Sequence, residues 1–101
     1  MFKNGMRPVH PGEVLREDYL KELGMSANAL AKALNVPAPR INDIVRERRG
    51  ITADTALRLA RYFDSSPQFW LNLQAMYDLR VAEIAVGKKI EREVSVMHRA
   101  A

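Results

Sequence analysis

The stretch "LAKALNVPAPRINDI", Leu30 to Ile44, decides the fold of this chain. Leu30 and Leu34 lie four residues apart and Ile41 and Ile44 lie three apart, so each pair falls on one face of a helix. Asn35 stands between the pairs, and asparagine tolerates the left-handed backbone conformation in which a helix ends. The sequence therefore predicts two short helices joined by a tight turn, which is the arrangement of a helix-turn-helix.

The two prolines in this stretch, Pro37 and Pro39, raise the question of whether the second helix is broken. Proline costs a helix nothing in its first turn, because the N–H groups there have no intrahelical partner. Pro37 can therefore be the N-cap and Pro39 the second helical residue. We predict an intact helix from about Ala38 to Arg46.

The remaining sequence predicts three further helices and no strand. Gly24 is expected to end the first of these as a C-cap, and Ser26, Thr52 and Ser66 are expected N-caps. Gly87 is expected to interrupt the last helix. The predicted helices cover residues 11–23, 27–34, 38–46, 53–63 and 67–86. The predicted fold class is an all-α, five-helix domain over residues 11–86, with an N-terminal arm at 1–10 and a polar C-terminal tail at 87–101.

The composition fits one soluble domain with an anionic partner. The chain has 101 residues, 48% of them hydrophobic, and a formal net charge of +4. This charge favours nucleic acid as a partner about as strongly as it favours a basic surface that is merely soluble. The chain has no cysteine and no apolar run as long as a bilayer span, so we expect a cytoplasmic protein without a membrane partner.

Four segments of the sequence resemble a known family. "LAKALNVPAPRINDI" is similar to the helix-turn-helix of the phage-repressor-like (XRE) group. "MRPVHPGEVLRE", "ITADTALRLARYF" and "PQFWLNLQ" resemble HigA-type antitoxins of bacterial type II toxin–antitoxin systems, and the resemblance covers roughly residues 6–86. It implies a five-helix domain, a homodimer, binding to double-stranded operator DNA, and a partner toxin that is an mRNA-cleaving ribonuclease.

Three positions depart from the wider repressor pattern. Ala27 stands where a glutamine is common, Asn35 where the turn often has glycine, and Pro37 where the second helix often has a serine or threonine N-cap. The missing hydroxyl removes a helix cap and also a group that often donates to phosphate. Other residues must therefore carry more of the DNA contact.

The resemblance assigns base contacts to the second helix of the motif. Its groove-facing residues are expected to be Ala38, Pro39, Arg40 and Asp43. Arg40 can bind guanine by a bidentate contact, unless it is an ordinary solvated arginine. Asp43 can accept a hydrogen bond from cytosine, or it can orient Arg40 or Arg46. Ala38 and Pro39 offer only apolar contact, for example to a thymine methyl group.

Phosphate contacts are expected from hydroxyl, amide and guanidinium groups around the motif. Helix N-termini attract phosphate, and arginines after a helix can contact the DNA backbone or remain solvated. The candidates are Ser26, Asn28, Arg46, Arg48, Arg49 and Thr52.

The apolar surface of the fifth helix predicts a symmetric dimer. It contains more large side chains than a domain of this size can bury, and proteins that bind operators generally pair two half-sites. Trp70 and Tyr77 are the candidate interface residues.

The sequence contains no candidate catalytic or metal site and implies no cofactor. His10 and His98 are the only histidines, and neither has a second ligand at metal-binding spacing. The leading hypothesis is a DNA-binding antitoxin that represses its own operon. The alternatives are a stand-alone repressor without a toxin, or a small enzyme or RNA-binding protein. An acidic face at Glu13, Glu17, Asp18 and Glu22 can meet a basic nuclease, or it can be an ordinary solvated face.

Overall fold

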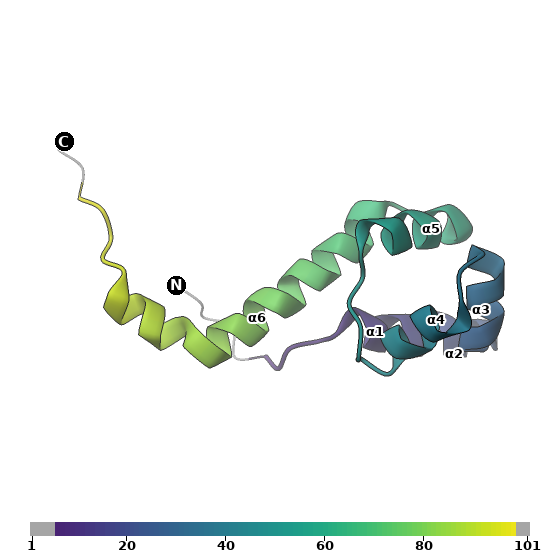
Figure 1. Cartoon of the computed structure of the whole chain (residues 1–101), viewed down its shortest axis with the longest axis horizontal. Coiled ribbons are helices and arrows are strands. Elements are labelled where there is room, and N and C mark those ends of the chain that lie inside the picture. The colour runs from purple at the N-terminus through teal and green to yellow at the C-terminus, as the bar shows by residue number, and fades with distance from the viewer. Residues whose placement is uncertain (1–5, 99–101) are drawn as a thin grey trace.

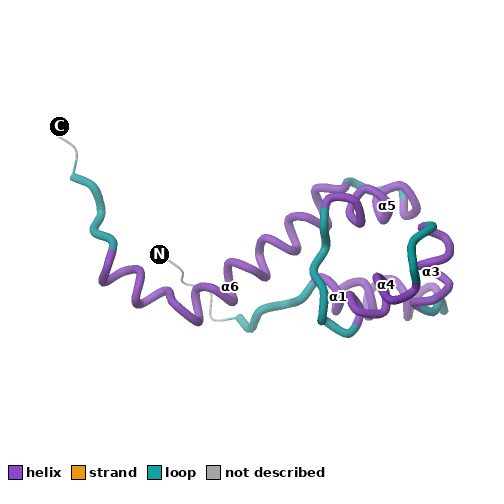
Figure 2. The backbone as a smooth tube through the Cα atoms, in the orientation of Figure 1, coloured by secondary structure: helices purple, strands orange, loops and turns teal. Residues whose placement is uncertain are grey.

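The computed structural model describes residues 6–98, and every regular element in that range is a helix. Helices α1 to α5 gather into one body, and α6 extends away from it (Figure 1). Figure 2 shows these helices joined by short loops, without a strand among the described residues. The all-α, five-helix prediction is confirmed. Within residues 6–98, no helix is both long enough and apolar enough to cross a bilayer.

The first of the five helices is a continuous run of three elements, α1 (Pro11–Val14), η1 (Leu15–Leu20) and α2 (Lys21–Leu23). Its middle part is π-helical, which the sequence pattern did not predict; the N–H of Lys21 donates to the carbonyl of Arg16 there. Gly24 ends the run with a φ of 60°, as predicted for a C-cap. At the other end, Nδ1 of His10 accepts a hydrogen bond from the N–H of Gly12 at 2.8 Å.

Helices α3 (Ala27–Leu34) and α4 (Ala38–Val45) form the predicted helix-turn-helix. Asn35 has a φ of 58°, which is the left-handed conformation expected where α3 ends. Pro37 is the N-cap of α4 and makes no side-chain capping hydrogen bond. The prolines therefore lie where a helix needs no N–H donor, and α4 is intact.

Helices α5 (Ala53–Phe63) and α6 (Pro67–Glu93) begin at the predicted caps, Thr52 and Ser66. The predicted interruption at Gly87 is wrong, because α6 continues through it to Glu93. One glycine costs a helix only about 1 kcal/mol, and the lysine and glutamate residues that follow Gly87 are good helix formers. The division of the chain into a domain and a tail at residue 87 stays a prediction.

The hydrophobic core lies where α3, α4 and α5 meet the first helical run and the start of α6. The largest fully buried side chains include Leu15, Leu30, Ile41, Ile44, Leu59 and Trp70. Trp70 packs against Tyr19 with ring centroids 5.1 Å apart. This burial corrects the expectation that Trp70 is a dimer-interface residue, since a side chain with 0% exposed surface cannot contact a second copy. Tyr77 is half-buried, and its interface role stays a prediction.

The C-terminal end of α4 is fixed by a close backbone contact with α1. A Cβ atom added at Gly12 would lie 1.8 Å from the carbonyl oxygen of Ile44, so only glycine fits at this position. One helical turn later, Nη1 of Arg16 donates to the carbonyl of Val45, and its Nη2 lies 3.4 Å from the carboxylate of Glu47. These contacts satisfy a carbonyl that the helix leaves free at its end, and they hold α4 against the first helix.

We predict opposite effects of alanine at two glycines. Gly12→Ala should lower the free energy of unfolding by about 1–3 kcal/mol or more, because the new methyl group overlaps backbone atoms that cannot rotate away. Gly87→Ala is the matched control: its nearest neighbour is Cγ of Glu83 at 3.4 Å, and alanine should stabilise α6 by about 0.5–1 kcal/mol. Urea unfolding at one fixed protein concentration measures both. Equal stability of the Gly12 variant and the wild type would contradict the close contact.

We also predict that acid weakens the fold through His10. Burial lowers the pKa of His10, an effect partly offset by Glu47 and Asp78 and reinforced by Arg16. Above about pH 6.5, the ordinary histidine value, His10 is neutral in both states and its contribution is fully present. As the pH falls below that value the unfolded chain takes up a proton that the folded chain excludes, so stability falls by at most about 1.4 kcal/mol per pH unit.

The measurement is urea unfolding between pH 7.5 and pH 5. His10→Asn keeps an oxygen that can cap Gly12 but cannot titrate, so its stability should depend less on pH than that of the wild type. His98→Asn removes the exposed histidine of the C-terminal segment and is the matched control for the loss of an imidazole. Identical pH profiles for His10→Asn and the wild type would contradict the role of His10.

Candidate nucleic-acid interface

The four expected base-contact residues lie in the first half of α4 and differ in exposure. Pro39 is exposed, whereas Ala38, Arg40 and Asp43 are half-buried. Pro39 has no N–H, and Pro37 offers no capping hydroxyl, so this end of α4 presents few polar groups of its own. Arg40 is the cation of the first turn of α4, and its side-chain contacts decide what this end of the helix can bind.

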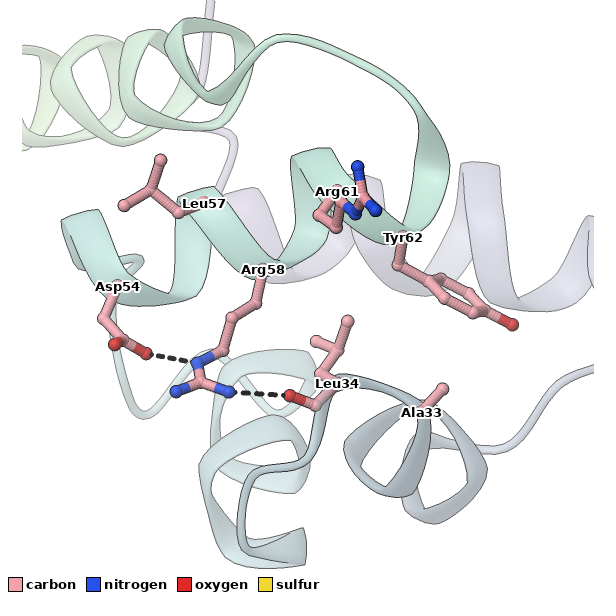
Figure 3. Close-up of a pocket in the computed structure, with 7 residues that line it drawn as sticks. All are labelled: Ala33, Leu34, Asp54, Leu57, Arg58, Arg61 and Tyr62. Atoms are coloured by element: carbon pink, nitrogen blue, oxygen red, sulfur yellow. Dashed lines mark hydrogen bonds and ion pairs between the residues drawn. The ribbon is translucent and has the colours of Figure 1, made fainter.

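Arg40 is held by an acid on the next helix. Its Nη1 lies 2.7 Å from Oδ1 of Asp54, near the start of α5. The same oxygen accepts from Nε of Arg58 at 2.7 Å, and Nη1 of Arg58 donates to the carbonyl of Leu34 at 2.9 Å (Figure 3). Hydrogen bonds from Arg58 and then Arg40 hold the pKa of Asp54 below its ordinary range, so this carboxylate stays charged at neutral pH.

Asp54 and Arg58 were not among the residues predicted for the site. The pair has the i, i+4 spacing at which opposite charges meet on a helix, and this signal was available. The link from Asp54 to Arg40 crosses a turn between two helices, and no local spacing indicates it.

Asp43 pairs with a different arginine from those expected. Its carboxylate lies 3.5 Å from Nη2 of Arg49, and in the described part of the chain it makes no ion pair with Arg40 or Arg46. The loop after α4 turns back over the helix, since the N–H of Arg48 donates to the carbonyl of Asp43 at 2.8 Å. Asp43 therefore orients Arg49 in this structure.

The start of α3 is linked to α4 through two asparagines. Nδ2 of Asn42 donates to Oδ1 of Asn28 at 2.7 Å and to the carbonyl of Ala38 at 2.9 Å. Asn42 was not among the expected site residues. Ser26 caps α3, with Oγ accepting from the N–H of Ala29 at 3.0 Å, and its hydroxyl proton remains able to donate elsewhere. Two of the expected phosphate contacts thus lie at one helix start that is tied to α4.

The other expected phosphate contacts lie around the loop between α4 and α5. Arg46, Arg48 and Arg49 have exposed side chains. Thr52 caps α5, and its Oγ1 accepts from the N–H of Thr55 at 3.4 Å. A shallow hollow brings several of these groups together, and it is lined by Arg40, Arg49, Gly50, Thr52, Asp54 and Thr55. The structure thus gathers Arg40, Arg49 and Thr52, while Arg46 and Arg48 lie outside this hollow.

Comparison with known proteins decides the family. A family model described as helix-turn-helix matches residues 17–70, which is more than half of the chain. A solved structure of the Pseudomonas aeruginosa antitoxin HigA with the higBA promoter is 58% identical, with a TM-score of 0.89 over 91% of this chain and 100% of that chain. The chain belongs to the HigA family of helix-turn-helix antitoxins.

Two further relatives agree with this assignment. The antitoxin GraA in complex with its operator is 54% identical, with a TM-score of 0.90 over 98% of this chain and 100% of that chain. Virulence-associated protein I of Dichelobacter nodosus is 67% identical over 81 residues, which make up 80% of this chain and 75% of that protein. The resemblance to HigA-type antitoxins is confirmed.

Membership of the HigA family places the emphasis on binding, since this is a DNA-binding and generally non-enzymatic family. Within residues 6–98, no group of three or more histidine, aspartate or glutamate side chains is arranged to hold a metal ion. His10, one of the two histidines, is occupied as a helix cap. The individual DNA contacts of this HigA-family chain stay predictions.

Proposed function

We propose that this protein is a DNA-binding antitoxin that represses transcription of its own operon in the cytoplasm and neutralises a cognate mRNA-cleaving ribonuclease toxin. The observation that carries the proposal is the match of 91% of the chain, at 58% identity, to the antitoxin HigA, whose structure includes the higBA promoter. The proposal assigns no catalytic step to this chain.

The DNA-binding half places α4 in the major groove. Arg40 donates two hydrogen bonds to a guanine, and Ala38 and Pro39 offer apolar surface to a thymine methyl group. Asp43 contributes by holding Arg49 at 3.5 Å, whether or not it also reaches a cytosine. Phosphates on either side of the groove contact the start of α3 at Ser26 and Asn28, the start of α5 at Thr52, and the arginines Arg46, Arg48 and Arg49.

The toxin-binding half rests on membership of the family. Two of the four acids of the face named from the sequence, Glu13 and Glu17, are paired within the chain itself. Glu13 pairs with Arg7 at 2.8 Å, and Glu17 pairs with Lys21 at 2.5 Å and Arg16 at 2.9 Å. These pairs weaken the case for that face as the toxin contact, and we assign no toxin surface.

The dimer proposal rests on the outer part of α6. This helix extends beyond the body (Figure 1). It has large exposed apolar side chains, namely Met76, Leu79, Val81, Ile84, Val86 and Ile90. Such exposed side chains are costly to leave in water, and a second copy of the same helix would bury part of them. Tyr77 lies on this helix, where its ring meets that of His10 at a centroid distance of 4.8 Å.

We predict a dimer in solution at micromolar concentration. Light scattering should give about twice the mass of the chain, and Ile84→Glu should reduce the mass to that of a monomer, because a charge at an exposed apolar position opposes association. Leu57→Glu changes an equally exposed leucine on α5 and is the matched control. A monomeric wild type would contradict the dimer.

We predict distinct effects of two arginine substitutions on DNA binding. Arg40→Ala should cost about 1–3 kcal/mol of operator affinity and relax specificity at one base pair. Arg48→Ala should weaken binding to all sequences and reduce the salt slope by about 1. The measurement is quantitative gel shift with DNA from upstream of the operon, at several salt concentrations. Arg61→Ala removes an exposed arginine at the other end of α5 from Asp54 and is the control (Figure 3).

Wild-type operator affinity of Arg40→Ala would show that Arg40 does not bind a base. The alternative function, a stand-alone repressor, would retain these DNA results but lack a toxin. Co-expression with the product of a neighbouring reading frame, followed by affinity capture of this chain, separates the two: recovery of a ribonuclease supports the antitoxin, and its absence favours the plain repressor.

A further inference from the structure

We propose that Asp54 is a positioning residue that determines the sequence specificity of Arg40. The carboxylate of Asp54 fixes the direction of the Arg40 guanidinium and keeps this cation from pairing with phosphates of any sequence. The inference rests on the proposed DNA-binding function and adds a residue to which neither the helix-turn-helix motif nor the base-contact pattern assigns a role.

The geometry of the Arg40–Asp54 pair leaves the base-binding edge of the guanidinium available. Asp54 accepts from Nη1 of Arg40 at 2.7 Å. In residues 6–98, Nε and Nη2 of Arg40 donate to no other group. A guanidinium is planar and has five donors, so one edge can remain on a carboxylate while another forms two parallel hydrogen bonds to O6 and N7 of a guanine.

Asp54 is itself held in place, which makes it a suitable support. Arg58, one turn later on α5, donates to the same Oδ1 atom at 2.7 Å, and it also donates to the carbonyl of Leu34 at the end of α3 at 2.9 Å. Figure 3 shows Arg58 extending between Asp54 and Leu34. The chain of contacts from Leu34 through Arg58 and Asp54 to Arg40 joins α3, α5 and α4. The direction of Arg40 is therefore set by the framework of the helix-turn-helix.

The charges of the three side chains also favour specificity. Arg40, Asp54 and Arg58 together have a net charge of +1, and removal of the carboxylate charge would raise it to +2. A long arginine freed from its acid can pair with phosphate on any DNA, and this contact carries no sequence information. Because Asp54 holds the guanidinium of Arg40, it weakens binding to wrong sequences more than binding to the correct one. Specificity is this difference in affinity, and a group that disfavours the wrong partner increases it.

The exposure of the pair argues against a mainly structural role. The side chain of Arg40 is 31% exposed and that of Asp54 is 57% exposed, and ion pairs this open to solvent contribute little to folding stability. Substitution of Asp54 should therefore leave the protein folded, so a change in DNA binding can be assigned to the positioning of Arg40.

The test compares Asp54→Asn with the wild type on two duplexes. One duplex comes from the DNA upstream of the operon, and the other is a scrambled sequence of equal length and composition. Asp54→Asn should bind the scrambled duplex about threefold or more tightly, with a salt slope larger by up to about 1, because one more cation can reach phosphate. The ratio of the two affinities should fall about fivefold or more as the contact with guanine loses its support.

Two further variants test that the effect passes through Arg40. In an Arg40→Ala background, Asp54→Asn should no longer change the affinity ratio, because the side chain that it positions is absent. Asp54→Glu keeps the negative charge and should recover part of the ratio. Asp18→Asn removes an exposed acid of the first helical run and is the matched control for the change in net charge.

Several results would overturn the proposal. Asp54→Asn could behave as Asp18→Asn does, or it could change both affinities by the same factor, and either result would leave only a general effect of charge. Tighter operator binding with a larger affinity ratio would show that Asp54 competes with the base for Arg40. Should the wild type fail to distinguish the two duplexes, the proposed DNA-binding function itself would fail, and that result is separate from the behaviour of Asp54. Thermal unfolding of each variant verifies that it is folded. If Asp54→Asn does not fold, Asp54→Glu provides the test.

Discussion

The placement of α4 depends on the backbone contact between Gly12 and the carbonyl of Ile44. No side chain fits between α1 and the end of α4, because an added Cβ would lie only 1.8 Å from that oxygen. Arg16 then donates to the carbonyl of Val45, so the same helical run both approaches α4 and caps it. A DNA-contacting helix must be held within a fraction of an ångström to present its donors correctly, and rigid elements do this better than loops. The close contact at Gly12 gives the C-terminal end of α4 such a rigid support.

The other end of α4 is positioned by side chains. Pro37 and Pro39 set the backbone of the first turn, but they supply neither a capping hydroxyl nor extra N–H donors. Arg40 is the charged group in this turn, and it is tied to α5 through Asp54 at 2.7 Å. The first helical run holds one end of α4 and α5 supports the other. Ala38 and Pro39 at the start of α4 have no polar side chain, but the next residue, Arg40, presents a guanidinium whose direction is set by Asp54.

The extent to which the sequence predicted this structure depends on how local each interaction is. A helix cap depends only on residues close to it in the sequence, so the caps at Ser26, Asn35 and Thr52 were predicted correctly. The interruption of the last helix was predicted from the low helix propensity of Gly87 alone. The helix-forming residues around Gly87 outweigh this propensity, so α6 continues. The burial of Trp70 and the contact from Asp54 to Arg40 depend on how helices pack, which a single sequence does not contain. Asp54 was therefore missed, whereas Asp43 was named as a possible partner of an arginine, although of Arg40 or Arg46 and not of Arg49.

Pairing with acids separates the arginines around α4 into two groups. Arg40 and Arg58 share Asp54, and Arg49 lies 3.5 Å from Asp43, so these three have a defined direction. In the described part of the chain, Arg46 and Arg48 have no acidic partner, and both are exposed. Free cations lose more side-chain entropy on binding, yet they adapt to the phosphates of any sequence, whereas a directed guanidinium favours one base pair. Under the proposed DNA contacts, discrimination between sequences would come mainly from Arg40, which Asp54 directs, and salt-dependent affinity mainly from the unpaired Arg46 and Arg48.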